Sequence, residues 1–429
     1  MSEFQRANRK HSAPEDTTES SANDAAALPA ADVAALPAAD VAGLPAADAA
    51  ALPGGGLVAL STVDPVALTT VDAAALTTVD VAALTTVDVA ALAAVAHARR
   101  SGSTRARLVT LALFLTLLLV FALSLTVGSY SVPLSEVPGI LLGGGAGQDR
   151  FVITQLRLPR AVAATLVGIA FGMGGTLFQR LLRNPLASPD VIGVSQGASA
   201  AAVAGLIVFG LSGAALSLAA FVGAVGTGAV IYGLARRGGV NGFRLVLVGV
   251  GVGAVLTSVV SYLMTWADVA LAQQALVWMI GNLNGRSWVQ VLPLAIALAV
   301  LIPAAALLAP ALNGLQLGDD VAAGLGLRVE YTRLLLLLIA TASVAFATAV
   351  AGPIAFVAFV ANPIATRLTG GGRTALIPAA LTGALVVLIA DFVAQHLLGA
   401  PLPVGVVTGA VGAPYLLWLL AAANRAGRI

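Results

Sequence analysis

One apolar segment with arginines at both ends limits what this chain can fold into. The segment from Ala161 to Leu182 is long enough, at about 1.5 Å per residue, to cross the hydrocarbon core of a bilayer as a helix. Arg157 and Arg160 precede it, Arg183 follows it, and prolines soon after disfavour further helix. Its small residues, which let neighbouring backbones approach closely, are Gly168, Gly172, Gly174, Gly175 and Thr176. This pattern predicts a membrane helix packed inside a helix bundle.

The composition supports a polytopic membrane protein. Hydrophobic residues make up 59% of the chain, charged residues only 10%, and the mean hydropathy is +0.97, whereas soluble domains carry about 25% charged residues. Cysteine is absent, which excludes disulfides, thiolate metal sites and cysteine nucleophiles. The polar first residues do not resemble a cleavable signal peptide.

Apolar runs follow one another from Leu108 onward, with short polar breaks. We expect an all-α fold of about ten transmembrane helices. Gly352 and Pro353 divide an apolar run of more than thirty residues that is too long for one span. The expected spans are Leu108–Val127, Ala161–Leu182, Val191–Leu211, Ser217–Leu234, Leu245–Thr265, Val291–Ala311, Leu334–Ala351, Pro353–Leu368, Leu376–Leu398 and Val404–Ala423.

The arginines orient these spans. With the N-terminus inside, fifteen arginines fall in cytoplasmic segments and four outside, which satisfies the positive-inside rule. Both termini are therefore predicted to be cytoplasmic. The four outer arginines are Arg150, Arg157, Arg160 and Arg286.

The first hundred residues have a different character. Between Asp24 and Leu92, aspartates and leucines recur with a period of eight, which matches neither a coiled coil nor a solenoid. An alanine-rich tract without aromatic residues buries too little surface to offset its ordering entropy. We therefore expect residues 1–104 to be a disordered cytoplasmic extension and 105–429 to be the membrane domain. A docking arm and a start codon placed too far upstream are the alternatives.

Charged residues also limit how transport is driven. The only lysine is Lys10, outside any glycine-rich loop, so the chain has no Walker A motif and is not expected to hydrolyse ATP. A proton-coupled carrier would need several buried carboxylates, and only Asp391 lies clearly inside a span, with Asp268 near an edge. Energy is therefore expected from a separate subunit.

A short polar segment between the sixth and seventh spans is a candidate docking site for that subunit. Asp319 or Asp320 suits a helix N-cap, and the region from Gly324 to Gly326 suits a helix end. Val321 and Leu325 share one face and would fit a groove on a partner. An ordinary capped connector explains the same residues.

Several motifs, in order, resemble those of the FecCD permease family over roughly Leu108 to Trp418. They are Arg157-Leu-Pro-Arg160, Asn184-Pro-Leu-Ala-Ser-Pro189, Gly193-Val-Ser-Gln-Gly-Ala198, Gly281-Asn-Leu-Asn-Gly285 with Trp288, Ala351-Gly-Pro-Ile354, Leu402-Pro-Val-Gly-Val-Val-Thr408 and Gly412-Ala-Pro-Tyr-Leu-Leu-Trp418. The resemblance implies a type II ABC importer permease in the cytoplasmic membrane. Two motifs look most like ferric catecholate siderophore permeases.

The resemblance also implies partners and sites. The expected partners are an ATP-binding cassette ATPase, a substrate-binding protein, a second permease and membrane lipid, with no nucleic acid and no cofactor beyond the ATP used by the ATPase. Family members receive the ATPase motion on a coupling helix, here matched by Gly318, Asp319, Asp320, Ala322, Leu325 and Gly326. Family arginines that match Arg157 and Arg160 meet glutamates of the binding protein. From the residues alone, headgroup anchoring explains both arginines equally well.

A further basic docking position in the family falls where this chain has Gln395 and His396. His396 either substitutes for it or is an interfacial histidine. The predicted translocation path includes Gly249, Gly253, Ser258 and Ser261 of the fifth span, together with Asn362. Tight packing inside one subunit explains the same small residues, and Asn362 also suits a hydrogen bond across helices.

The sequence thus predicts the permease subunit of a binding-protein-dependent importer for ferric siderophores. The same machinery importing haem or cobalamin is the nearest alternative. A self-contained secondary transporter and a polytopic membrane enzyme are further alternatives. The enzyme would need convergent catalytic groups, and the chain has only three histidines.

Overall fold

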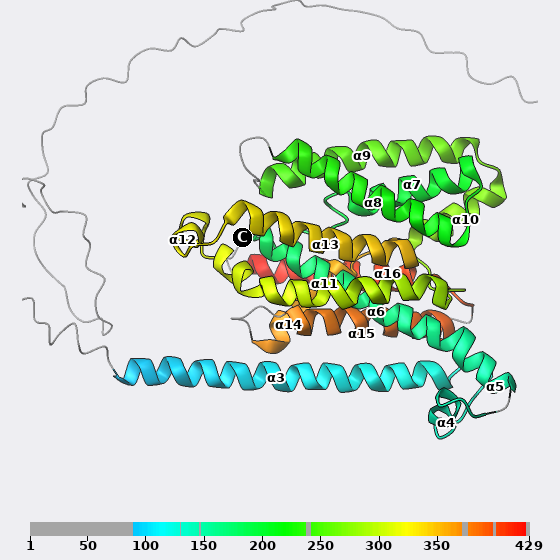
Figure 1. Cartoon of the computed structure of the whole chain (residues 1–429), viewed down its shortest axis with the longest axis horizontal. Helices are drawn as coiled ribbons and strands as arrows, with labels where there is room; N and C mark the ends of the chain where they lie inside the picture. The colour runs from blue at the N-terminus through cyan, green and yellow to red at the C-terminus, as the bar shows by residue number, and fades with distance from the viewer. Residues whose placement is uncertain are drawn as a thin grey trace, which may run out of the picture. The chain divides into compact units, whose positions relative to one another are not determined.

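The computed structural model describes residues 89–128, 130–145, 147–236, 242–370, 376–397 and 400–425. Every regular element within these ranges is a helix (Figure 1). All ten expected membrane segments are helical: α3 (Val89–Thr126), α6 (Leu158–Leu181), α7 (Val194–Phe209), α8 (Gly213–Ala235), α9 (Gly242–Trp266), α11 (Trp288–Leu315), α13 (Val329–Ala351), α14 (Val357–Thr369), α15 (Leu376–His396) and α16 (Val404–Arg425). The all-α prediction is confirmed.

Not all ten helices are long enough to cross a bilayer. Among the described residues, seven apolar helical segments have the required length, including the continuous run Gly147–Leu181 that contains α6. The shorter apolar helices include α7 and α10 (Val269–Ile280), and α14 has only 13 residues. Helix α10 was not predicted, because its 12 residues are too few to give the length signal of a span.

Four small elements complete the fold. At one end of the bundle, α4 (Val137–Leu141), α5 (Gly147–Phe151) and the π-helix η2 (Val152–Arg157) precede α6. Helix α12 (Asp319–Gly324) lies at the opposite end (Figure 1). The arginine distribution predicts that the α12 end is cytoplasmic and that the α4 and α5 end is outer, and the two ends are named accordingly.

The boundary of the N-terminal extension differs from the prediction. Helix α3 begins at Val89, so the last residues assigned to the 1–104 extension are helical. The apolar part of α3 begins near Ser103, close to the predicted start of the membrane domain. The eight-residue repeats up to residue 88 lie outside the described residues, and their predicted disorder stays a prediction.

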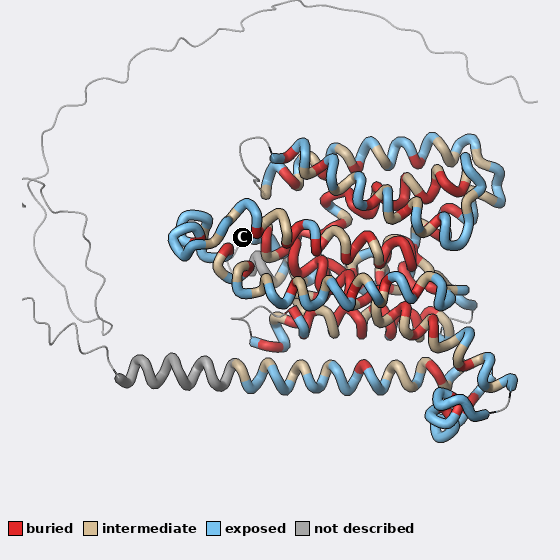
Figure 2. The backbone as a smooth tube through the Cα atoms, viewed as in Figure 1, coloured by how far each residue is buried: buried red, intermediate tan, exposed pale blue. Residues whose placement is uncertain are grey.

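Helix α6 occupies the core of the bundle. Of the residues in its most apolar stretch, 78% are buried, compared with 11% in that of α3 (Figure 2). Helix α6 packs against α11, α13, α14 and α15. Two glycines explain how close these neighbours come. A Cβ at Gly168 would collide with the backbone of Gly383 and Ala384, and one at Gly175 with the carbonyl of Ala358. The small residues of α6 therefore set its packing distance.

Large apolar side chains remain exposed around the bundle. They are frequent on α3, α8, α9 and α11, and at most 22% of the most apolar residues of each of these helices are buried. Figure 2 shows long stretches of these helices as exposed or intermediate. In water such a surface would drive association, whereas hydrocarbon tails solvate it. These helices form the lipid-facing or partner-facing surface of the molecule.

The break between α13 and α14 is where the sequence predicts it. Gly352 ends α13 with a φ of 74°, and Phe356 precedes α14 with a φ of 68°. A Cβ at Gly352 would collide with the carbonyl of Trp278 near the end of α10, so this position requires glycine for space as well as for conformation.

Candidate functional site

The outer end of α6 carries a buried ion pair. Arg160 donates from Nε to Asp391 Oδ2 at 2.8 Å and from one terminal nitrogen to Asp391 Oδ1 at 2.7 Å. The other terminal nitrogen donates to Asn284 Oδ1 at 2.5 Å. The side chain of Asp391 is 9% exposed and that of Arg160 is 21% exposed. This bidentate geometry joins α6 to α15, and Asn284 adds the segment between α10 and α11.

Gln395 belongs to the same cluster. Its Nε2 donates to Asn284 Oδ1 at 3.1 Å, so one amide oxygen accepts hydrogen bonds from both Arg160 and Gln395. His396 lies beside it on α15 but is exposed, and its Nδ1 is 3.0 Å from the carbonyl oxygen of Phe392 in its own helix. The structure thus brings Arg160 and Gln395 together and leaves His396 at the surface.

Arg157 ties α3 to the start of α6. One terminal nitrogen donates to the carbonyl oxygens of Leu125 at 2.8 Å and Thr126 at 3.1 Å, and the other donates to the carbonyl of Tyr130. Leu125 and Thr126 are the last residues of α3, whose final carbonyls lack helical partners. A cation at this position complements both the free carbonyls and the helix dipole.

These contacts change how the two arginines are interpreted. The family resemblance implies that both face a binding protein, and the residues alone fit headgroup anchoring equally well, whereas each arginine has intrachain partners in the structure. Docking of a binding protein on Arg157 and Arg160 stays a prediction, and it now requires them to keep or exchange those partners.

Other ionisable groups lie near this outer surface. The hydroxyl of Tyr130 donates to Asp149 Oδ1 at 2.5 Å, and this hydrogen bond is the main cause that raises the pKa of Tyr130. Burial lowers the pKa of Arg286, whose Nε donates to the carbonyl of Asn282 at 3.3 Å. Arg150 is exposed, with a long contact of 3.5 Å to the carbonyl of Gly143.

At the cytoplasmic end, two arginines hold the first residue of α12. Both carboxylate oxygens of Asp319 lie 2.9 Å from Arg333 on α13, and Oδ1 lies 3.4 Å from Arg183 just after α6. Arg183 also donates to the carbonyl of Leu315, and its own φ is 50°. This second cluster connects α6, α11, α12 and α13.

The local geometry of α12 corrects one prediction. Gly318, with a φ of 117°, occupies the N-cap position that the sequence assigns to Asp319 or Asp320. The carboxylate of Asp319 binds arginines instead of capping the helix. Helix α12 ends at Gly324, within the predicted region, and Gly326 follows with a φ of 81°.

Helix α12 presents an apolar face away from the bundle. Ala322 is fully buried, while Val321 and Leu325 are 51% and 65% exposed and neighbouring Leu317 is 63% exposed. Asp320 is exposed beside them. The arrangement is a short helix anchored at its first residue, with an apolar surface that nothing in the described chain covers.

The predicted path residues of α9 divide between two environments. Gly249 and Gly253 are buried, and the backbone of Ile192 and Gly193 packs against them. Ser258 and Ser261 are exposed on α9. The two glycines pack closely against the segment before α7, whereas the two serines lie on an open face. A pathway role for these four residues stays a prediction.

Asn362 makes polar contacts inside the bundle. Its Nδ2 donates to Gln179 Oε1 on α6 at 2.9 Å, and Gln179 in turn donates to the carbonyl of Phe359 at 2.9 Å. This is the cross-helix arrangement that the packing interpretation expects. A role of Asn362 in the pathway stays a prediction.

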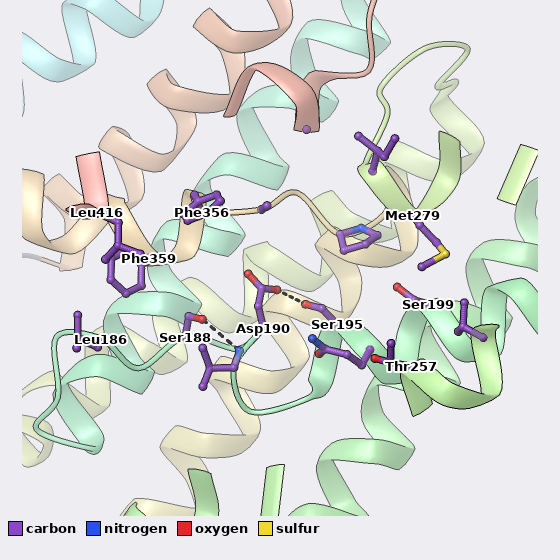
Figure 3. Close-up of a pocket in the computed structure, with 17 residues that line it drawn as sticks. Leu186, Ser188, Asp190, Ser195, Ser199, Thr257, Met279, Phe356, Phe359 and Leu416 are labelled. Carbon is purple, nitrogen blue, oxygen red and sulfur yellow. Dashed lines mark hydrogen bonds between the residues drawn. The ribbon is translucent and has the colours of Figure 1, made fainter. Parts of the chain in front are cut away.

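A pocket of about 740 Å³ lies where the short helices end (Figure 3). Ser195 contributes from the first turn of α7, Ile280 from the last residue of α10, and Phe356 from the residue before α14. Thr257 of α9 and Leu416 of α16 complete the wall. Broken helices that meet at one site are the usual architecture of binding sites in transporters.

Sequence reasoning missed three polar residues of these sites. Asp391 was noted as a lone carboxylate, but its partner Arg160 could not be assigned without the fold. Asn284 was noted only as part of a motif. Asp190, on the wall of the pocket, falls just before the predicted third span; a carboxylate between Pro189 and two apolar residues was the available signal.

Comparison with known proteins agrees with this architecture. Residues 115–422 match the model of the FecCD transport family. The chain is 42% identical over 299 residues to a ferric enterobactin transport system permease protein of Escherichia coli (strain K12), covering 70% of this chain and 91% of that protein. It is 39% identical over 329 residues to an achromobactin transport system permease protein of Dickeya dadantii (strain 3937), covering 75% and 93%.

A Gram-positive relative and a solved structure agree as well. An Fe(3+)-citrate import system permease protein of Bacillus subtilis (strain 168) is 37% identical over 321 residues, covering 74% of this chain and 95% of that protein. A metal-chelate type ABC transporter in an inward-facing conformation superimposes with a TM-score of 0.64 at 26% identity, covering 74% of this chain and 99% of that chain.

The fold and these matches define a multi-pass membrane permease. The chain belongs to the FecCD transport family.

Proposed function

We propose that this chain is the permease subunit of an ATP-driven, binding-protein-dependent importer for ferric siderophores. Support for the substrate class comes from relatives named for ferric enterobactin, achromobactin and Fe(3+)-citrate, which span different chelate chemistries. Iron would cross inside its chelator, because the described residues contain no group of three or more His, Cys, Asp or Glu side chains able to hold a metal ion.

The proposal that ATP drives transport rests on helix α12, which is anchored at its first residue. The Asp319 cluster fixes its start to α6 and α13, while Val321, Leu325 and Leu317 remain exposed. A separate ATPase that accepts this apolar face in a groove would move α12, and the arginine contacts would pass that motion to α6 in the core.

A second permease and a binding protein complete the proposed complex. The exposed faces of α9, with Ser258 and Ser261, suit a pathway formed between two permeases. The outer surface near Arg150, Arg157 and Arg160 suits acidic residues of a binding protein, where charge complementarity sets orientation more than affinity. The arginine distribution supports a cytoplasmic location for both termini.

Uptake in cells tests the proposed function. Cells lacking the chain, with and without its restoration, would be given labelled ferric catecholate, ferric hydroxamate, haem or cobalamin. Restored uptake of one ferric chelate supports the proposal. Restored uptake of haem or cobalamin would support an importer but contradict the proposed substrate. Uptake of a ferric chelate that persists without ATP would contradict the ATP-driven mechanism.

A further inference from the structure

The pocket at the ends of the short helices combines mostly apolar lining residues with polar ones, which include Asp190, Ser199 and Thr257 (Figure 3). In Figure 3, Asp190 and Ser195 lie across the pocket from Phe356 and Phe359 of the segment at the start of α14. Gln196, which follows Ser195 in the sequence, also lines the pocket, and Asp190, Ser195 and Gln196 are together called the polar wall. Its volume of about 740 Å³ lies in the range of small-molecule sites, which combine apolar walls with a few placed polar groups.

The polar wall is rich in hydrogen-bond acceptors. Oδ1 of Asp190 accepts a hydrogen bond from the hydroxyl of Ser195, and Oδ2 has no ion-pair partner among the described residues. The side-chain oxygen Oε1 of Gln196 is buried without a hydrogen-bond partner. Among the residues that the structure describes, no Arg, Lys or His lines the pocket. The polar wall thus offers hydrogen-bond acceptors to a ligand, and no described residue of the lining supplies a positive charge to pair with Asp190.

Asp190 lies at a depth in the bundle where a carboxylate without a positively charged partner is costly. Ile192 and Gly193, which follow Asp190 closely, pack on Gly249 and Gly253, about one third to one half of the way along α9. The pocket therefore lies well inside the length of a membrane-spanning helix. An ionisable side chain at such depth is costly unless it has a partner. The first turn of α7 and Ser195 stabilise the carboxylate but do not neutralise it.

We propose that this pocket binds a small organic cation, namely an ammonium group on an apolar or aromatic body, with Asp190 as its charge partner. The ammonium would lie between Asp190 Oδ2 and Gln196 Oε1, and the body would lie against Phe356, Phe359 and Met279. A charge-assisted hydrogen bond is about twice as strong as a neutral one. One carboxylate supplies too few ligands for Ca²⁺ or Mg²⁺, and an anion would be repelled.

For transport, this inference rests on the proposed function. A ferric chelate with a free ammonium arm would place that arm in the pocket during passage, whereas the same chelate with the amine acetylated would not. Binding of the cation itself requires neither an ATPase nor transport, so it is tested separately.

The test is calorimetric titration of the full chain in lipid nanodiscs with phenethylammonium and with neutral 2-phenylethanol, empty nanodiscs supplying the lipid background. We expect phenethylammonium to bind the chain about tenfold or more tightly than 2-phenylethanol. The Asp190→Asn variant should lose that difference. The matched control is Asp268→Asn, because Asp268 is exposed at the start of α10 and makes no capping hydrogen bond.

A second variant keeps the proposal testable if Asp190→Asn does not fold. Thr257→Phe fills the pocket from an exposed position on α9 and should weaken binding of both probes. Equal affinity for the two probes, an unchanged preference in Asp190→Asn, or unaltered binding in Thr257→Phe would each overturn the proposal. None of these results depends on uptake, so a failure of the proposed function would be seen separately.

Discussion

Arg160 and Asp391, 231 residues apart in the sequence, form a bidentate ion pair that fastens the outer end of α6 to α15. At the other end of α6, Arg183 and Arg333 share the carboxylate of Asp319. The most buried membrane helix is therefore joined by charge contacts to the outer surface at one end and to α12 at the other. In the proposed importer, α6 would therefore link the two proposed docking surfaces mechanically.

Removing one member of the Arg160–Asp391 pair should lower the free energy of unfolding more than removing both members. Arg160→Met leaves Asp391 buried without a partner, which we expect to lower the free energy of unfolding by about 2–4 kcal/mol. The double variant Arg160→Met/Asp391→Leu should recover most of that loss. Thermal unfolding in detergent, followed by tryptophan fluorescence, measures both effects.

The control for this cycle is Arg150→Met, because Arg150 is exposed and has no ion pair among the described residues. Its unfolding should match that of the unmodified chain within about 0.5 kcal/mol. A single Arg160→Met variant as stable as this control would show that the ion pair contributes nothing.

Arg157→Met should loosen the end of α3. The carbonyls of Leu125, Thr126 and Tyr130 would lose their guanidinium partner, and the last turn of α3 should fray into solvent. Hydrogen–deuterium exchange should therefore speed up in residues 123–130 and remain unchanged in α13. If exchange in residues 123–130 stays the same, the contacts of Arg157 do not hold the end of α3, which would contradict this account of its role.

Two variants of the α12 region should separate anchoring from docking. Leu325→Arg places a charge on the exposed apolar face and should weaken ATPase binding by about 2 kcal/mol, roughly thirtyfold. Asp319→Asn should preserve much of that binding but reduce uptake per ATP hydrolysed, because α12 loses its contacts to Arg333 and Arg183. Copurification and coupled assays report the two quantities.

Leu142→Arg is the control for Leu325→Arg, since Leu142 is 90% exposed at the outer end of the bundle. It should leave ATPase binding intact. Equal ATPase affinity for Leu325→Arg and the unmodified chain would remove α12 as the docking surface.

Asn362→Ala distinguishes packing from a pathway role. Losing the hydrogen bond to Gln179 leaves a buried amide oxygen without its donor, which should cost about 1–3 kcal/mol of stability. The apparent KM for uptake should not change. A shifted KM in a protein of normal stability would place Asn362 in the pathway instead.

The absence of cysteine allows a direct test of orientation. Single cysteines introduced at Leu142 and Leu325, both exposed, can be labelled with a membrane-impermeant maleimide. We expect Leu142→Cys to react in intact cells and Leu325→Cys to react only after permeabilisation. The reverse pattern would invert the predicted topology.

Sequence reasoning found the helices well because length and apolar content determine them locally. All ten expected spans are helical, and the Gly352–Pro353 break separates α13 from α14. Helix α10 was not predicted because its 12 residues are fewer than a membrane-spanning helix needs. The N-cap of α12 was misassigned because Asp319 has arginine partners that are distant in sequence and prevail over local capping.

Side-chain partners at the candidate sites were much harder to predict. Arg157 and Arg160 are equally consistent with lipid headgroups, a binding protein or intrachain contacts when only their spacing is known. Choosing among these needs the packing of α6 on α15 and the position of the end of α3. The same holds for Asp190, whose pocket forms from five segments that are separated in sequence.

ATP-dependent uptake in proteoliposomes tests the central claim most directly. The chain would be reconstituted with the ATPase and any second permease that copurify with it, and supplied with binding protein and labelled ferric tricatecholate. The account predicts accumulation that requires both ATP and binding protein and that falls sharply in Leu325→Arg. Accumulation that continues without ATP, driven by a proton gradient, would contradict it.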